Sequence, residues 1–168
     1  MTTHIRSIYL VRHAIAAERG DKWPDDAERP LTHEGAWRMR RIVKGLGELD
    51  ASIDLVLTSP LVRAVETAEI LVHELNPEPE LATLPLLAPG GTPARIAEAL
   101  AAYPKTQSVA LVGHGPGIGE LAAWLIGGRV PLNLKKGGVC RIDVTDWPPA
   151  RSGELIFLAT PKMLRALA

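Results

Sequence analysis

The sequence predicts a three-layer α/β/α sandwich with a mostly parallel sheet, because strand-like and helix-like segments alternate along its 168 residues. The strand-like segments are short, continuous apolar runs, which suit strands buried on both faces. The helix-like segments carry apolar residues at helical spacing. No period of about 20–50 residues recurs, which excludes a repeat protein. The length suits one domain with a substantial core, so we expect residues 1–168 to form a single domain.

The first half of the chain predicts two strands and two helices around a long loop. Thr32 and Ser59 are suited to be helix N-caps, and Pro60 suits the first helical position. The loop is polar and contains proline, and long loops in compact domains are often functional. In chain order the segments are a strand at 7–11, the loop at 14–30, a helix from 32 to about 49, a strand at 54–58 and a helix from 59 to about 75.

The second half predicts two further helices and a strand pair near the end. Thr92 and Pro93 begin one helix, and two glycines at 127–128 end the other. In chain order the segments are an extended stretch at 81–87, a helix from 92 to about 103, a strand at 108–112, a helix at about 117–126 and strands at 139–144 and 154–159.

The composition is that of an ordinary globular protein. Lys and Arg number 19, as do Asp and Glu, so the formal net charge is zero, which argues against a surface built for nucleic acid. No apolar run is long enough to cross a bilayer and none resembles a secretion signal, so we expect a cytoplasmic protein without a membrane partner. Cys140 is the only cysteine and suits the core; an internal disulfide and a CxxC metal site are therefore excluded.

Basic and imidazole side chains follow three predicted strands. Arg12 and His13 follow the first strand, His114 and Gly115 follow the strand at 108–112, and Arg63 lies just after the strand at 54–58. Because the carboxyl ends of strands in an open α/β sheet meet at one edge, we expect these residues to share a pocket. Arginine offers a fork of donors for phosphate, and neutral histidine can act as a nucleophile.

Each of these residues also has a purely structural interpretation. Arg12 suits a surface ion pair, Arg63 could pair with Glu66 three residues on, and His13 or His114 could be hydrogen-bonded core histidines. Their equivalent positions at strand ends favour the functional interpretation. We expect the other histidines to be surface or packing residues, and the helical tryptophans to be buried: these are His4, His33 and His73, and Trp37 and Trp124.

Competing motifs for phosphate, metal and nucleophile chemistry are absent from the sequence. The glycine-rich stretch at 113–119 contains neither GxGxxG nor the Gly-Lys-Ser/Thr ending of a P-loop. HExxH and GxSxG do not occur, and the two strand-end histidines have no obvious third metal ligand. We therefore expect neither a metal nor a cofactor.

Five segments together resemble the histidine phosphatase superfamily, which has the phosphoglycerate mutase-like fold, and within it the short SixA-type phosphohistidine phosphatases. Arg-His at a strand end and Ser-Pro-x-x-Arg-Ala-x-x-Thr-Ala are the most specific motifs. The segments are LVRHA at 10–14, RPLTHEG at 29–35, TSPLVRAVETA at 58–68, VGHGP at 112–116 and KKGG at 135–138.

The resemblance implies a role for each strand-end residue. His13 would attack phosphorus and become a phosphohistidine intermediate. Arg12 and Arg63 would hold the phosphoryl oxygens, with His114 donating to one of them and Gly115 contributing to phosphate binding. These groups would supply the positive charge, so the enzyme would need no metal.

The substrate is the open question. Larger members of the superfamily carry a carboxylic acid for an alkoxide leaving group, but the corresponding stretch at 84–91 contains none. Imidazole can leave as a neutral ring and needs less help from an acid. The absence of the carboxylic acid therefore favours protein phosphohistidine as the substrate, for instance on a histidine phosphotransfer domain. An acid of the first loop could replace it: Glu18, Asp21, Asp25 or Asp26. The alternatives are a small phosphate ester or phosphoanhydride as substrate, and a phosphate- or phosphoprotein-binding module without turnover.

Overall fold

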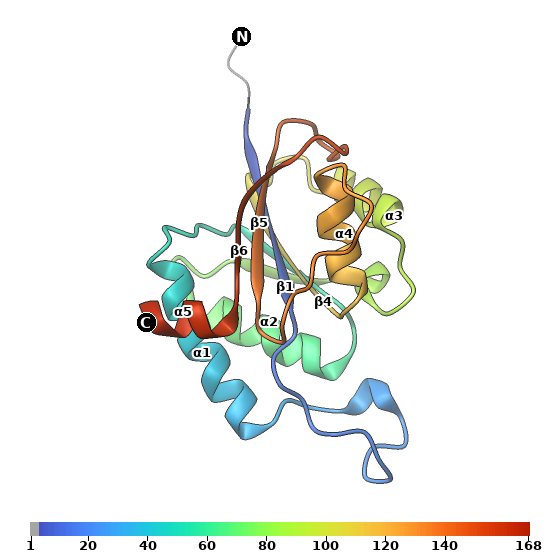
Figure 1. Cartoon of the computed structure of the whole chain (residues 1–168), viewed down its shortest axis with the longest axis vertical. Helices are drawn as coiled ribbons and strands as arrows, with labels where there is room; N and C mark the ends of the chain where they lie inside the picture. The colour runs from blue at the N-terminus through green and yellow to red at the C-terminus, as the bar shows by residue number, and fades with distance from the viewer. Residues whose placement is uncertain (1–3) are drawn as a thin grey trace.

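The computed structural model describes residues 4–168, which form one six-stranded sheet covered by helices (Figure 1). The sheet order is β3-β2-β4-β1-β5-β6. The strands are β1 (Arg6–Arg12), β2 (Leu55–Thr58), β3 (Glu80–Thr83), β4 (Ser108–Gly113), β5 (Val139–Val144) and β6 (Glu154–Ala159). The helices are α1 (His33–Gly47), α2 (Val62–Glu74), α3 (Pro93–Ala99), α4 (Gly117–Leu125) and α5 (Pro161–Leu167), with 3-10 turns at Asp26–Glu28, Pro85–Leu87 and Leu100–Ala102.

The sheet is mixed and mostly parallel. β1, β4, β2 and β3 pair in parallel, whereas β5 pairs antiparallel with both β1 and β6. Only β5 therefore runs against the other five strands. This confirms the predicted α/β class and the predicted strand pair near the end of the chain.

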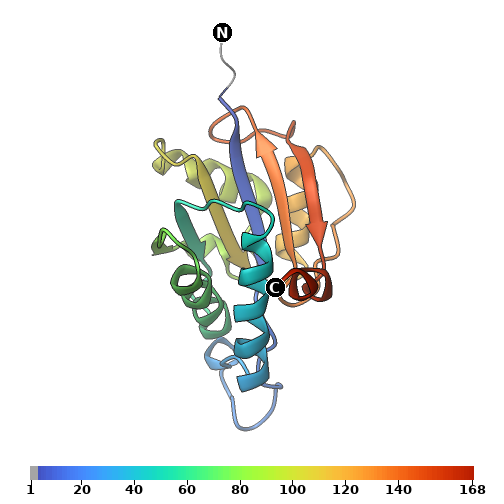
Figure 2. The same ribbon diagram turned by 90° about the vertical axis from the view of Figure 1, so that its left-hand side faces the viewer.

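Helices cover both faces of the sheet, so strand residues are buried on either side. α1, α2 and α5 lie on one face, and α3 and α4 lie on the other (Figures 1 and 2). In β1, Tyr9 and Val11 belong to the apolar core under α1 and α2, whereas Ile8 and Leu10 belong to the core under α3 and α4. Burial on both faces explains the continuous apolar run, because neither side of the strand meets water.

The second helix begins later than the sequence predicts. It starts at Val62 with Leu61 as N-cap, so the prediction that Ser59 caps it was wrong. The carbonyl of Leu61 accepts the first helical hydrogen bonds, from Ala64 and Val65. The side chain of Ser59 is instead used at the strand-end edge described below.

Three other expectations need correction. The extended stretch predicted at 81–87 divides into β3 and a 3-10 turn. α5 was not predicted, although Thr160 caps it by accepting the Met163 N–H and Pro161 begins it, as Thr92 and Pro93 were expected to begin α3. Trp37 is 51% exposed on the outer side of α1, so its predicted burial was wrong. Cys140, by contrast, is a buried core residue as predicted.

None of the helices formed by residues 4–168 combines the length and the apolar character that a membrane crossing requires.

α1 and α5 approach so closely that one position between them has no room for a side chain. A Cβ on Gly45 would lie 1.8 Å from the carbonyl oxygen of Leu164, whereas a Cβ on Gly47 would meet nothing within 4 Å. Glycine at position 45 therefore permits the contact between the two helices.

We expect Gly45→Ala to lower the free energy of unfolding by about 1–3 kcal/mol, because the added methyl forces α5 away from α1. Gly47→Ala is the matched control and should raise stability by about 0.5–1 kcal/mol, since it removes backbone freedom without a clash. Urea unfolding followed by circular dichroism measures both. Equal effects of the two substitutions would contradict this account of the α1–α5 contact.

Candidate active site

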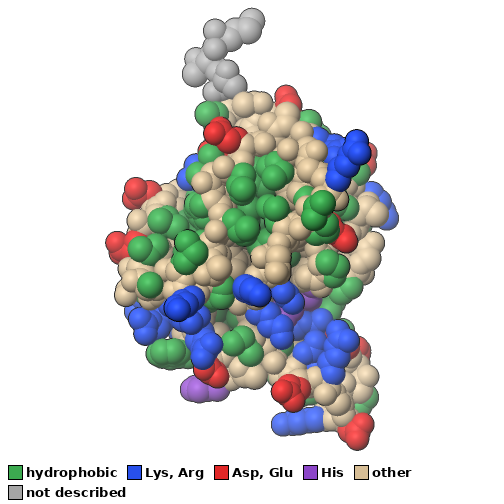
Figure 3. Space-filling model, in the orientation of Figure 1, with side chains coloured by type: hydrophobic (Ala, Val, Ile, Leu, Met, Phe, Trp, Pro, Cys, Tyr) green, Lys and Arg blue, Asp and Glu red, His purple; other side chains and the backbone are tan. Residues whose placement is uncertain are grey.

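The carboxyl ends of three neighbouring strands bring the predicted residues to one edge of the sheet. The backbone N–H of His13 donates to Gly113 (3.0 Å), and that of Ser59 donates to Val112 (3.0 Å). His13, Ser59 and His114 thus each stand immediately beyond a strand. On the face of the molecule drawn in Figure 3, a histidine side chain lies among Lys and Arg side chains.

His13 is buried, with only 6% of its surface exposed, and its ring is held in one tautomer. Nδ1 lies 2.7 Å from the carbonyl oxygen of Ala14. Because a carbonyl only accepts, Nδ1 must carry the proton, which leaves the lone pair on Nε2. The pKa of His13 is lowered to about 3, mainly by burial and to a smaller extent by the neighbouring His114, Arg63 and Arg12. The ring is therefore neutral near pH 7.

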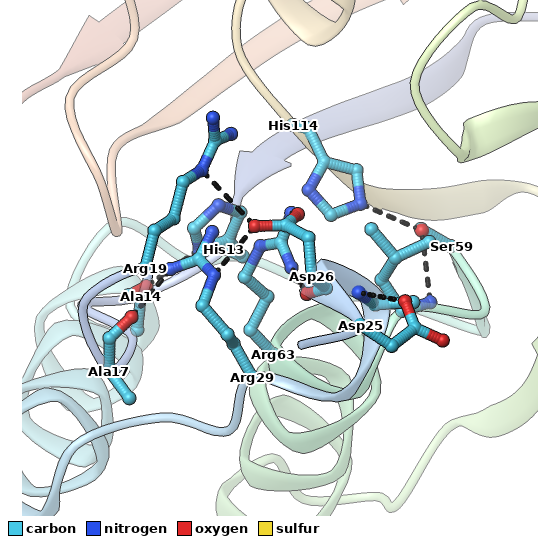
Figure 4. Close-up of polar contacts among 12 residues, drawn as sticks. His13, Ala14, Ala17, Arg19, Asp25, Asp26, Arg29, Ser59, Arg63 and His114 are labelled. Atoms are coloured by element: carbon cyan, nitrogen blue, oxygen red, sulfur yellow. Dashed lines mark hydrogen bonds and ion pairs between the residues drawn. The ribbon is translucent and has the colours of Figure 1, made fainter. Parts of the chain in front are cut away.

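His114 faces His13, and their ring centroids lie 5.1 Å apart (Figure 4). Its Nε2 lies 2.7 Å from the hydroxyl oxygen of Ser59. That oxygen already accepts the Leu61 N–H at 3.3 Å, so the hydroxyl hydrogen is free to point at Nε2. Nδ1 of His114 is buried without a partner among the described residues. Burial, followed by the charge of Arg63, lowers the pKa of His114 to about 4.

Ser59 is thus a site residue that the sequence interpretation missed. The signal was present, because Ser59 follows a strand directly, as His13 and His114 do. Its position before a proline favoured the capping interpretation instead.

Arg63 lies in the first turn of α2, as predicted, and is only 3% exposed. Its Nη1 donates to the backbone oxygen of Asp26 (2.8 Å), and Nη2 donates to the Asp26 carboxylate (3.0 Å). The third group, Nε, is buried and has no partner among residues 4–168. Glu66, the partner that the purely structural interpretation offered for Arg63, instead accepts the Leu31 N–H (2.6 Å).

Asp26 is the one first-loop acid that reaches this edge. Besides Arg63, its carboxylate accepts from Arg29 (Nε, 2.8 Å) and lies 3.1 Å from Nε of Arg19 (Figure 4). The hydrogen bond from Arg29 is the main reason that the pKa of Asp26 is lowered. Of the other acids that the sequence offered, Asp25 accepts the Ala27 N–H, and Glu18 and Asp21 are exposed.

Arg29 is a second residue that sequence reasoning did not assign to the site. It is buried, and its Nη1 also donates to the carbonyl of Ala17 (2.5 Å), which fixes the start of the long loop to its end. No periodicity marks this position, because it lies in irregular backbone before the proline at 30.

Arg12 lies against the loop that follows β4 and bonds to the segment that precedes β5. Its Nη1 donates to the carbonyl of Leu134 (2.8 Å), while its Nε is buried without a partner in the described chain. A Cβ on Gly115 would stand only 3.0 Å from the Arg12 guanidinium carbon. The absence of a side chain at Gly115 therefore gives the guanidinium room to lie against the loop.

A cavity of about 350 Å³ adjoins His114 between the turn before α3 and the start of α4. Residues 86–93 and 113–121 provide nearly all of its lining, which is largely apolar or backbone. Among the described residues that line it, only Glu120 bears a carboxylate. Within residues 4–168, no three His, Cys, Asp or Glu side chains lie close enough together to hold a metal ion.

The chain matches known proteins over most of its length. Residues 8–87 match the histidine phosphatase superfamily (branch 1). The chain is 38% identical over 165 residues to an uncharacterized protein from Picosynechococcus sp., covering 94% of this chain and 98% of that protein. It is 32% identical over 141 residues to the phosphohistidine phosphatase SixA of Escherichia coli, covering 83% and 86% respectively.

Solved structures share the whole architecture. The protein histidine phosphatase SixA complexed with tungstate superposes with a TM-score of 0.81 at 27% identity, covering 94% of this chain and 99% of that one. A putative SixA from Nakamurella multipartitia has a TM-score of 0.76 over 94% of this chain and 96% of its own, and at 22% identity it shows the fold alone. Sequence identity along most of both chains and the shared fold together place this protein in the histidine phosphatase superfamily, branch 1.

Proposed function

We propose that this phosphatase removes the phosphoryl group from phosphohistidine on a protein, through a covalent intermediate on His13. The observation that carries the proposal is the fixed tautomer of His13. With Nδ1 donating to the Ala14 carbonyl, the lone pair of Nε2 is available to attack phosphorus. The depressed pKa of the ring keeps that lone pair unprotonated near neutral pH.

The reaction proceeds in two displacements. In the first, the Nε2 lone pair of His13 bonds to phosphorus while the phosphorus–nitrogen bond of the substrate breaks. Its electron pair goes to the substrate imidazole, which leaves as a neutral ring when its other nitrogen carries a proton. In the second, water bonds to phosphorus and the electron pair of the broken phosphorus–nitrogen bond returns to Nε2. One proton of the attacking water passes to the solvent, and orthophosphate is released. Nucleophile and leaving group are both imidazoles, so the first step needs no separate acid.

Buried donors around His13 support this assignment. Nε of Arg12, Nε of Arg63 and Nδ1 of His114 all lack partners among the described residues, and a phosphoryl group presents three oxygens that need such donors. Ser59 would keep the proton on Nδ1 of His114 by donating its own hydroxyl hydrogen to Nε2. With these cationic and neutral donors in place, the proposed mechanism uses no metal.

Asp26 would position Arg63 rather than donate a proton. Its lowered pKa keeps the carboxylate ionised, and its two contacts fix the outer edge of the Arg63 guanidinium. The tungstate of the solved SixA complex is a tetrahedral oxyanion, which is consistent with a site of this fold that holds phosphate.

A small phosphate ester or phosphoanhydride is a second candidate substrate. The cavity of about 350 Å³ beside His114 favours it, because a small leaving group would fit there. Apart from Glu120, the described residues that line this cavity offer an alkoxide no carboxylic acid, which favours phosphohistidine as the first candidate.

The main test compares a phosphorylated histidine phosphotransfer domain with p-nitrophenyl phosphate as substrates. We expect faster turnover of the phosphohistidine protein and an acid-labile phosphoenzyme that can be trapped in the wild type. His13→Ala should lower turnover by more than roughly a thousandfold, because it removes the nucleophile. His33→Ala, at an exposed histidine of α1, is the control and should behave as the wild type.

Each other outcome points to a different conclusion. Activity retained in His13→Ala would contradict the nucleophile. Faster turnover of the ester would favour the small-molecule candidate. Phosphate binding without turnover or phosphoenzyme would show a binding module.

A second prediction concerns pH. Because their folded pKa values are about 3 and 4, His13 and His114 should stay neutral from pH 8 to 5, as followed by nitrogen-15 NMR of the rings in the phosphate-free protein. In the unfolded chain both rings take up protons near pH 6.5, so stability should be full above that pH. Below pH 6.5 the free energy of unfolding should fall by about 1.4 kcal/mol per pH unit for each ring. The variants His13→Ala and His114→Ala assign the ring signals, because each variant lacks the signals of one ring. If either ring takes up a proton near pH 6.5 in the folded protein, the prediction is contradicted.

A third prediction separates positioning from proton donation by Asp26. Asp26→Asn should lower kcat by roughly five- to tenfold, because the ion pair with Arg63 becomes a hydrogen bond to a neutral amide. Inhibition by orthophosphate should become stronger, since a negative charge beside the site is removed. Asp21→Asn, at an exposed loop position, is the matched control. If the two variants behave alike, Asp26 does not position Arg63.

A further inference from the structure

One surface beside the site is strongly basic although the whole chain has no net charge. Three segments form it: α1, α5 and the turn at 134–138. Together they hold eight Lys or Arg and only one Glu. We name this surface the basic face and define it by the six of these cations that have no carboxylate within 4.0 Å in the described part of the chain: Arg41, Lys44, Lys135, Lys136, Lys162 and Arg165.

The basic face is continuous with the rim of the site. The N–H of Gly137 donates to the carbonyls of Arg12 (3.0 Å) and His13 (3.1 Å), so the two-lysine turn is bonded to the end of β1. The same turn contacts the helices, because a Cβ on Gly137 would lie 2.8 Å from Ile42 in α1 and 3.7 Å from Pro161 at the start of α5. The surface therefore leads from His13 across the turn to both helices.

The helices of the basic face are also joined to each other. Nη2 of Arg41 in α1 lies 3.5 Å from the carbonyl oxygen of Arg165 in α5. The two other arginines of α1, Arg38 and Arg40, have carboxylate partners and are left out of the basic face. Figure 3 shows Lys and Arg gathered in a band across the lower half of the molecule, at the level of a histidine, with most Asp and Glu towards the edges.

Exposed apolar side chains accompany these charges. Trp37 on α1 is 51% exposed, and the Arg41 guanidinium lies 5.5 Å from its ring centre. Met163 on α5 is 56% exposed. Tryptophan and arginine are the residues most often found at the energetic centres of protein–protein interfaces. The basic face thus offers an apolar anchor as well as positive charge.

The geometry points to a docking surface: the basic face binds an acidic surface of the phosphoprotein while its phosphohistidine reaches His13. This inference rests on the proposed function, because it identifies the partner of that site. A protein partner fits better than a polyanion of indefinite length. The 19 acidic residues of the chain cancel its positive charge overall, so a long polyanion would be repelled beyond this face, whereas a discrete acidic patch would not.

The test uses a double charge reversal, Lys44→Glu with Lys162→Glu, at two exposed positions. The matched control is Arg95→Glu with Lys105→Glu, which makes the same change of charge at exposed positions outside the basic face. The substrates are an acidic histidine phosphotransfer domain, phosphorylated with phosphoramidate, and the free amino acid phosphohistidine. Both are assayed at low and at high salt.

We expect the Lys44/Lys162 variant to raise KM for the phosphoprotein by roughly tenfold at low salt, and the gap to the wild type to close at high salt as charges are screened. Turnover of free phosphohistidine should be unchanged in both variants, and the control should match the wild type on both substrates. Equal loss in the control, or no loss in the Lys44/Lys162 variant, would overturn the docking surface.

A binding measurement separates this inference from the proposed function. Fluorescence anisotropy of the labelled, unphosphorylated acidic domain measures docking without turnover, and the Lys44/Lys162 variant should bind it about tenfold more weakly. Failure of the wild type to dephosphorylate either the phosphoprotein or free phosphohistidine would count against the proposed function, whatever the anisotropy shows. Tighter binding of duplex DNA or phosphatidylserine vesicles than of the acidic domain, lost in the same variant, would overturn the choice of a protein partner.

Discussion

The alignment of β1 with β4 and β2 at their carboxyl ends is the constraint on which the site depends. Backbone hydrogen bonds set this alignment, through the N–H groups of His13 and Ser59. Because these bonds lie inside a sheet that is buried on both faces, a shift in register would expose apolar strand residues. The positions of two histidines and a serine at one edge are therefore fixed by the packing of the whole domain.

Burial at this edge has opposite consequences for the imidazole and guanidinium groups. It lowers the pKa of His13 and of His114 far enough that both rings are neutral at physiological pH. The guanidinium of Arg63 stays charged and is buried, so it needs a compensating partner, and the loop supplies Asp26. The long loop is thus part of the site, because it brings the carboxylate that a buried arginine requires. A neutral nucleophile beside held cations is the combination that phosphoryl transfer uses.

Two surfaces of different character meet the site. The cavity beside His114 is small and largely apolar, whereas the basic face that starts at the turn with Lys135 and Lys136 is broad and charged. The first suits a small leaving group and the second suits a macromolecule. The choice between the two substrate candidates is therefore also a choice between these surfaces.

The sequence by itself determined the α/β class, the order of most elements and the placement of the predicted site residues at strand ends: Arg12, His13, Arg63 and His114. It could do so because the periodicity of a helix or strand and the point where a strand ends depend on short segments of sequence. Only the tertiary structure decided which side chains meet. Ser59 pairs with His114 from 55 positions away, and Asp26 pairs with Arg63 from 37 positions away. The basic face likewise joins α1 to a turn and a helix more than 80 residues further along the chain. Such contacts leave no local pattern, since they depend on how the sheet and its helices pack.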